Sequence, residues 1–233
     1  MKYQESDNVI YYENHRFPSF EGTHDTKISV VNNDTFTLAH ELLPAISCCL
    51  NFASHKRPGG GYKSVMNRKG PIRTQEEDLF RRSDLPWIMD NNEIRRYYPM
   101  EDVAGLYCSC VVSKDCDLGL VTPFTTNVIT VPAVVNPNSD EKLELSRKKM
   151  KLILDMAADN CQELLILGAW GCGVFNNDPE FVAERFKVLL ASEFKGVFKE
   201  VIFAIPSGAP GTVAGASTGN HKVFESVFFS EKA

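Results

Sequence analysis

The alternation of apolar runs with amphipathic segments predicts a protein built of alternating strands and helices. Continuous apolar runs suit strands that are buried on both faces of a sheet, and they occur at 27–33, 45–52, 105–112, 127–134, 163–169 and 200–206. Segments with helical spacing of apolar residues lie between and after them, at 34–43, 74–85, 139–160, 179–194 and about 221–229. This order predicts a three-layer α/β/α sandwich.

Helix starts are marked by capping residues. Asp34 or Thr35 precedes the first predicted helix, Thr74 opens the second, and Asp178 followed by Pro179 opens the fourth; these are favoured residues at helix N-termini. The first strand, helix and second strand form a βαβ unit. We therefore predict that strands 27–33 and 45–52 pair in parallel.

The chain divides into an arm and one domain. Residues 1–26 are polar with scattered aromatic residues and predict an extended N-terminal arm. Its aromatic side chains are expected to pack at the periphery, and the alternative is that they anchor the arm on the body of the domain. Residues 27–233 have the length and composition of one α/β domain. Residues 207–221, rich in Gly, Ala, Ser and Thr, predict a mobile loop before the last helix.

Charge and cysteine content exclude several classes of protein. A net charge of −5 argues against general nucleic-acid binding through a broad cationic surface. No stretch of 18 apolar residues and no apolar leader segment occurs, so we expect no membrane contact and a cytoplasmic protein, or a nuclear one in a eukaryote. The seven cysteines lack C-x2-C spacing, so we expect no metal site and mostly buried, reduced thiols.

Two glycine-rich segments follow predicted strands, where ligands bind in open α/β sheets. In NFASHKRPGGGY, residues 51–62, three consecutive glycines suggest positive φ angles or close approach of backbone to a ligand. In LILGAWGCGVFNNDPEF, residues 165–181, a glycine-rich bend leads into a helix N-terminus, which suits a diphosphate. A flexible surface loop and a tight structural turn are the alternative interpretations of these two segments.

An acidic pair lies between these segments, at the start of a predicted helix. Glu76 and Glu77 follow Gln75, and burial in a cleft would raise the pKa of at least one of the two carboxyl groups. Such a carboxyl group can act as an acid at neutral pH. Taken alone, however, acidic residues are common in first helical turns because their negative charge interacts favourably with the helix dipole.

The combination is more specific than its parts. NFAS, PGGG, QEEDL, VPAV and GAWGCGVFNNDP, in this order over residues 27–206, resemble the microbial type of poly(ADP-ribose) glycohydrolase, a branch of the macrodomain fold. The resemblance implies a macrodomain-like mixed sheet, ADP-ribose or poly(ADP-ribose) on modified proteins as the partner, reversal of ADP-ribosylation as the role, and no cofactor. We expect a monomer.

The resemblance also implies roles for individual residues. Glu77 matches the catalytic carboxyl, and Glu76, grouped with it, matches the residue that holds the ribose hydroxyls. The implied substrate-binding residues are Gln75, Gly59, Gly60, Gly61, Asn51, Ser54, Asp34, Gly171, Cys172, Gly173, Val174 and Phe175. Among them, the glycine triplet and residues 171–175 would bind the diphosphate, Asn51 and Ser54 the terminal ribose, and Asp34 the adenine amine.

One departure from the family pattern concerns the segment before the predicted helix 74–85, which carries Glu77. The spacer between Gly61 and Gln75 has thirteen residues, longer than is typical of the family, and it contains Lys63, Arg68, Lys69 and Arg73. It forms either a basic flap that contacts phosphates or a macromolecular substrate, or an inert loop. If it displaced the helix, Glu77 would lie too far from the scissile bond.

Three functions therefore remain open at the level of sequence. The first is hydrolysis of ribose–ribose linkages in poly(ADP-ribose), with Glu77 as general acid and base; a variant of it is hydrolysis of single ADP-ribose groups on proteins. The second is non-catalytic recognition of ADP-ribose. The third is an unrelated α/β protein whose glycines are structural.

Overall fold

The structure is a computed structural model that describes residues 2–5, 8–69, 74–207 and 219–230. Within these ranges, eight strands form one mixed sheet in the order β1-β2-β5-β6-β4-β7-β8-β3. The strands are β1 Lys2–Glu5, β2 Asn8–Tyr12, β3 Lys27–Val31, β4 Cys48–Ala53, β5 Ala104–Lys114, β6 Leu120–Pro132, β7 Leu164–Leu167 and β8 Glu200–Ala204. From β6 to β3 all neighbours are parallel, whereas β1, β2 and β5 add antiparallel pairs at the other end.

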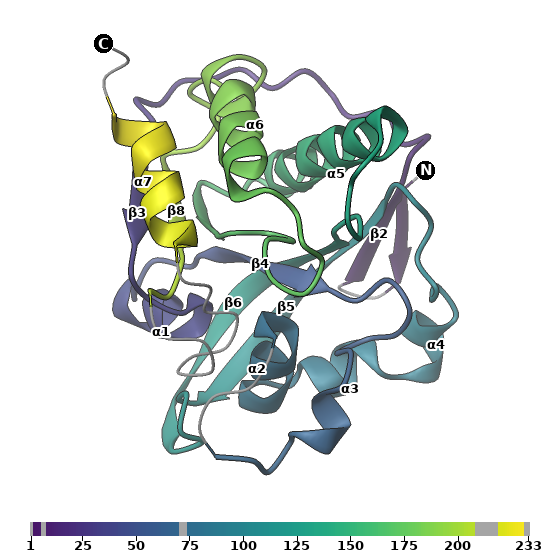
Figure 1. The fold of residues 1–233 in the computed structure, drawn as a ribbon. Helices are drawn as coiled ribbons and strands as arrows, with labels where there is room; N and C mark the ends of the chain where they lie inside the picture. Colours follow the sequence, from purple (N-terminus) through teal and green to yellow (C-terminus); the bar gives the residue numbers. More distant parts are fainter. Residues whose placement is uncertain (1, 6–7, 70–73, 208–218, 231–233) are drawn as a thin grey trace.

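Helices cover both faces of this sheet (Figure 1). They are α1 Thr35–Glu41, α2 Gln75–Arg82, α3 Leu85–Met89, α4 Asn92–Arg95, α5 Asp140–Asp159, α6 Pro179–Ala191 and α7 Asn220–Phe229, with a short 3-10 turn at Tyr62–Ser64. Asp34, Thr74 and Asp178 cap α1, α2 and α6 through their side chains, as predicted. The three-layer α/β/α sandwich with a mixed sheet is thereby confirmed.

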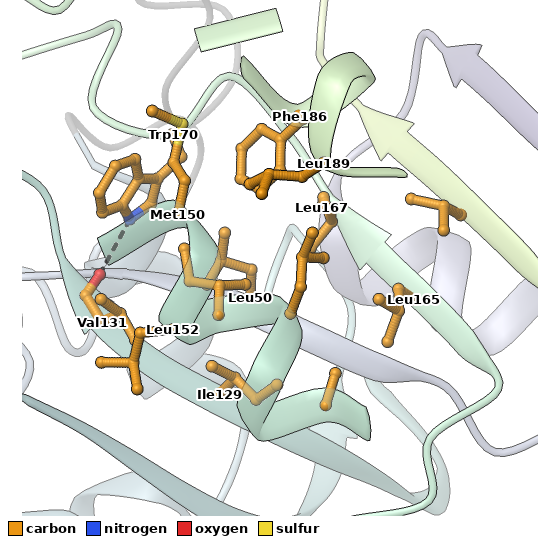
Figure 2. Close-up of a cluster of buried hydrophobic side chains, with 14 of the residues drawn as sticks. Leu50, Ile129, Val131, Met150, Leu152, Leu165, Leu167, Trp170, Phe186 and Leu189 are labelled. Carbon is orange, nitrogen blue, oxygen red and sulfur yellow. Dashed lines mark hydrogen bonds between the residues drawn. The ribbon is translucent and has the colours of Figure 1, made fainter. Parts of the chain in front are cut away.

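Alternation along the strands divides the core into two layers. Cys48 and Leu50 of β4 face one layer, with α5, α6 and α7, while Cys49 faces the other, with α1, α2 and α3. Figure 2 shows the first layer, in which Leu50, Leu167 and Phe186 meet between the sheet and the helices. The sheet is therefore rigidly held from both sides, and its strand ends are fixed platforms for a site.

The predicted pairing of the first two strands is wrong. β3 and β4 run parallel in the same sheet, but β7 and β8 lie between them. β3 pairs with β8, so that Val30 lies opposite Phe203. The later strands β7 and β8 thus fill the space between β3 and β4, which a local βαβ pattern does not reveal.

The N-terminal segment is more than an arm. Residues 8–12 form β2, which pairs antiparallel with β5, and the described backbone of β1 pairs with β2. Tyr11 is fully buried, and its hydroxyl donates to Asp159 at the end of α5. Phe17 and Phe20 pack against the core layer formed with α5. The prediction of purely peripheral packing is therefore wrong for Tyr11.

Other sequence expectations have mixed outcomes. Four of the seven cysteines are buried, one is half-buried, two are exposed, and none forms a disulfide. Most of the predicted loop 207–221 and the spacer residue Arg73 lie outside the described residues. In the part of the chain that the structure describes, no helix is long and apolar enough to cross a membrane.

Candidate active site

A pocket opens at the edge of the sheet where the parallel strands end. Segments that follow β3, β6, β7 and β8 all contribute to it, as do Phe52 of β4 and the first turn of α2. Its lining residues are Asp34, Thr35, Phe52, Thr74, Gln75, Asp78, Ala133, Ala169, Gly171, Gly173, Val174, Phe175, Ala204, Ile205 and Pro206. Carboxyl ends of parallel strands are where open α/β sheets bind ligands.

The pocket collects part of the predicted site. Asp34, Gln75 and the loop residues Gly171, Gly173, Val174 and Phe175 line it. The other predicted residues do not: Asn51, Ser54, Gly59, Gly60, Gly61, Glu76, Glu77 and Cys172 lie outside its lining. The sequence analysis missed Phe52 and the segment 204–206, which line the pocket with apolar groups. Phe52 directly follows Asn51, and strand alternation places the two side chains on opposite faces.

Gln75 ties α2 to the sheet. Its side-chain oxygen accepts a hydrogen bond from Phe52 N–H (2.9 Å), and its amide nitrogen donates to Leu50 O (2.7 Å) and Thr35 Oγ1 (3.0 Å). Both amide hydrogens are therefore used within the protein. Gln75 holds the start of α2 against the end of β4. It forms part of the pocket wall, but its polar groups are bonded within the protein.

Glu76 points inward and binds the glycine loop. Its two carboxyl oxygens accept hydrogen bonds from Ser54 N–H (2.8 Å) and Gly59 N–H (3.0 Å), and the side chain is 3% exposed. Burial raises the pKa of Glu76 to about 8, although these N–H groups and the Asn51 side chain lower it. The predicted contact of Glu76 with ribose stays a prediction, and in this structure its oxygens fix the loop.

The raised pKa predicts a pH-dependent stability. Between about pH 4.5 and pH 8 the folded chain holds the Glu76 proton that the unfolded chain releases, so the stabilisation is complete below pH 4.5 and is lost as the pH rises to about 8. We expect the unfolding free energy of Glu76→Gln, measured relative to that of the native protein, to rise by on the order of 2–4 kcal/mol when the pH is raised from about 5 to about 8.5. Urea unfolding at both pH values measures this. A difference in unfolding free energy that did not change with pH would contradict the assignment.

Asn51 lies beneath the site rather than in the pocket. Its side chain is fully buried, and its amide nitrogen donates to Thr130 Oγ1 (3.2 Å). Within the described residues its side-chain oxygen has no hydrogen-bond partner. Ser54, in contrast, is half-buried at the end of β4 and contributes its backbone N–H to Glu76. Asn51 and Ser54 therefore both lie beside Glu76.

Glu77 points toward the glycine loop and is half-buried. Its backbone N–H is capped by Thr74 Oγ1, and a Cβ placed on Gly61 would come within 2.6 Å of Glu77 Oε1. Gly59 and Gly60 have φ angles of +70° and +55°, and a Cβ on Gly59 would meet the rings of Tyr62 and Phe80. The loop therefore favours glycine at Gly59 and Gly60 for their backbone angles, and a side chain at Gly61 would displace the carboxyl end of Glu77.

The second glycine loop is held by two buried side chains that the sequence analysis did not assign. Trp170 is fully buried and donates its indole N–H to Val131 O (2.9 Å; Figure 2). Asn177 donates its amide N–H groups to Val134 O (2.8 Å) and Gly171 O (3.1 Å). These bonds fasten the loop to the end of β6. The only signal in the sequence was the polar Asn177 directly after a glycine-rich bend.

Cys172 is a structural member of this loop. Its thiol lies 3.6 Å from Trp170 O, and burial raises its pKa to about 12. The thiol is therefore protonated at neutral pH and is a poor nucleophile. A Cβ on Gly173 would meet no other atom within 4 Å, whereas a Cβ on Gly171 would collide with Asn177. Gly173 thus leaves room on the pocket side of the loop.

Asn177→Ala is expected to loosen the loop and weaken ligand binding. Two buried carbonyl groups would lose their donors, which destabilises the fold by about 1–3 kcal/mol. Thermal unfolding and calorimetry with ADP-ribose, the ligand that the sequence resemblance implies, measure both effects. The exposed Asn138→Ala serves as the control, with neither quantity changed. Wild-type stability and ADP-ribose affinity in Asn177→Ala would disprove the role of this residue.

Asp34 lines the pocket but is bonded to the protein. It accepts a hydrogen bond from Thr37 N–H (2.9 Å) and forms an ion pair with Arg82 (2.7 Å). Burial raises the pKa of Asp34, but Arg82 and Thr37 outweigh this effect and hold the pKa below its usual value. Asp34 is thus a fixed carboxylate at the pocket wall. Its predicted contact with an adenine amine stays a prediction.

Comparisons with known proteins point to one family. A sequence profile described as the microbial-type PARG catalytic domain matches residues 1–113. The poly(ADP-ribose) glycohydrolase of Deinococcus radiodurans, solved with ADP-ribose, is 31% identical over 89% of this chain and 86% of that chain, with a TM-score of 0.75. The chain belongs to the microbial-type poly(ADP-ribose) glycohydrolase family.

A second member of the family supports the match. The glycohydrolase of Thermomonospora curvata, solved with the inhibitor ADP-HPD, is 30% identical over 88% of this chain and 80% of that chain, with a TM-score of 0.73. A search of curated proteins found no match. Despite the long spacer, α2 contacts the glycine loop in this chain: Glu76 accepts a hydrogen bond from Gly59 N–H, and Glu77 lies beside Gly61.

Proposed function

We propose that this protein hydrolyses ribose–ribose linkages of poly(ADP-ribose) carried by modified proteins and releases ADP-ribose, acting as a monomer. The observation that carries the proposal is the position of Glu77. Glu77 belongs to the first turn of α2, and its carboxyl group lies beside Gly61 of the glycine loop. Gln75, in the same helical turn, lines the pocket. Family members solved with ADP-ribose and with ADP-HPD support a ligand of this class.

The reaction follows from a single carboxyl group. Glu77 donates a proton to the oxygen of the departing ribose, and the C–O bond breaks to leave an oxocarbenium-like ribose in the pocket. The resulting carboxylate then takes a proton from the water that attacks this ribose. The diphosphate of the substrate, held between the two glycine loops, is suited to stabilise the developing positive charge.

Catalysis is favoured over simple recognition by the contact between α2 and the glycine loop. A displaced helix would have separated Glu77 from the glycines, and the structure shows the two side by side. Purified protein incubated with labelled poly(ADP-ribose) should therefore release free ADP-ribose with time. ADP-ribose binding without release would indicate a reader, and release only from singly modified protein would indicate a mono-ADP-ribosyl hydrolase.

A further inference from the structure

Positive charge is concentrated next to the catalytic helix. Of the 25 Lys and Arg residues in the chain, five lie between residues 55 and 69, where no Asp or Glu occurs, although the whole chain has a net charge of −5. We call residues 55–69 the basic segment. Its cations are Lys56, Arg57, Lys63, Arg68 and Lys69. Solvated surfaces usually intersperse the two signs of charge, so this separation indicates a partner of opposite sign.

Four of the five cations are available to such a partner. Lys63 pairs with Asp90 (2.8 Å). Lys56, Arg57, Arg68 and Lys69 are exposed, and none of them forms an ion pair with an acidic residue in the described parts of the chain. These four positive charges are therefore exposed to solvent and are not neutralised by an acidic side chain in the described parts of the chain.

The backbone of the basic segment is held in place by buried groups. Arg81, 2% exposed, donates from its guanidinium to Arg68 O (2.6 Å). Tyr62, also buried, donates its hydroxyl to Asp90 (2.7 Å), and its N–H bonds Gly59 O (2.9 Å). The described part of the spacer is therefore held at Tyr62 by Asp90, which directly follows α3, and at Arg68 by Arg81 of α2.

The basic segment flanks the carboxyl group proposed to act on the substrate. A Cβ on Gly61 would lie 2.6 Å from Glu77 Oε1 and 3.8 Å from Ser64 Oγ, so Glu77 and the turn at residues 62–64 share this position. The pocket is lined instead by Thr74, Gln75 and Asp78 of the α2 region. If the terminal unit of a polymer occupies the pocket and its linkage is cut at Glu77, the rest of the polymer, which departs, lies beside the basic segment.

We propose that the basic segment binds the diphosphate groups of the departing part of poly(ADP-ribose), next to the linkage that is cut. This inference rests on the proposed function. Each unit of the polymer carries a diphosphate, and exposed Lys and Arg side chains bind such a polyanion with a strong dependence on salt. The segment then selects polymer over single ADP-ribose units, because a single unit has no departing part.

The test compares binding of polymer with binding of the monomer in the Glu77→Gln background, which leaves the polymer uncut. The variant Lys56→Gln/Arg57→Gln/Arg68→Gln/Lys69→Gln should bind labelled poly(ADP-ribose) about tenfold more weakly, while its affinity for ADP-ribose stays within about twofold. The slope of log affinity against log salt concentration should become shallower by about 2–3. The matched control, Lys27→Gln/Lys148→Gln/Lys195→Gln/Lys199→Gln, removes four exposed lysines and should change neither affinity.

Three results would overturn the inference. Unchanged polymer affinity and salt slope would show that the cations do not bind the polymer. Equal loss of polymer and ADP-ribose affinity would place the cations in the monomer site. Displacement of the polymer by single-stranded DNA of the same charge at equal concentration would identify a nucleic-acid surface. If the wild-type protein released no ADP-ribose, the proposed function would fail, while the binding comparison would still decide this inference.

Discussion

Glu77→Gln is expected to slow the release of ADP-ribose from poly(ADP-ribose) by about 10²–10⁴-fold, the range for loss of a general acid. Glutamine has the size of glutamate but has no acidic proton to give to the departing ribose. The half-buried side chain beside Gly61 accepts this replacement without new contacts. ADP-ribose affinity, measured by calorimetry, should therefore stay within a few-fold of the native value while turnover of labelled polymer falls.

Two further variants make this result specific. Glu93→Gln changes an exposed carboxylate on α4 and should leave turnover unchanged. Glu76→Gln replaces the acceptor of the Ser54 and Gly59 N–H groups, so it should lower ADP-ribose affinity as well as turnover. If Glu77→Gln kept native turnover, or if it lost affinity in parallel with turnover, the role of Glu77 as acid would be wrong.

The types and order of the longer elements could be predicted from the sequence, because periodicity reports how a segment is buried. The predicted helix 139–160 is α5, Asp140–Asp159, and the predicted strand 127–134 lies within or just beyond β6, Leu120–Pro132. Periodicity does not report which strands are neighbours. The insertion of β7 and β8 between β3 and β4 depends on contacts far apart in the chain, so the predicted pairing failed.

Short elements were missed for a different reason. β2 has five residues in a polar surrounding, and its strand character comes from pairing with β5 and from the burial of Tyr11. α3 and α4 have five and four residues, too few for a helical period to be visible. Such segments are stabilised by tertiary contacts rather than by their own pattern.

The candidate site was predictable as a set of segments but not as a set of contacts. The resemblance implied ligand contacts for Gln75, Glu76 and Glu77, but the sequence did not indicate which groups of the protein these side chains bond. The helical turn directs Gln75 to the sheet, Glu76 to the loop and Glu77 to Gly61. The supporting residues Arg81 and Arg82 carried no visible signal, since charges spaced three or four residues apart on a helix usually lie on a solvated face.

Arg82→Met is expected to destabilise the protein by about 3–5 kcal/mol, because it removes the cation that pairs with Asp34 and one of the two cations that pair with the buried Asp78, which keeps Arg81. Arg82 is 2% exposed, and its guanidinium binds Asp34 (2.7 Å), Asp78 (2.9 Å) and Lys114 O (3.2 Å). Methionine fills a similar volume, so the lost charge accounts for most of the effect. Urea unfolding followed by circular dichroism measures it.

The control is a pair of the same chemistry in which the arginine is half exposed and the aspartate, Asp90, keeps a second cation in Lys63. Arg95 binds Asp90 at 3.2 Å with about half of its side chain exposed, and Arg95→Met should change the unfolding free energy by no more than about 1 kcal/mol. Because Asp34 and Asp78 both line the pocket, Arg82→Met should also lower the affinity for ADP-ribose in the fraction that remains folded. Equal losses of unfolding free energy in Arg82→Met and Arg95→Met would mean that the buried charges beneath the pocket stabilise the fold no more than a pair with a half-exposed arginine does. A stability loss confined to Arg82→Met would show that the wall of the pocket is held by this ion pair.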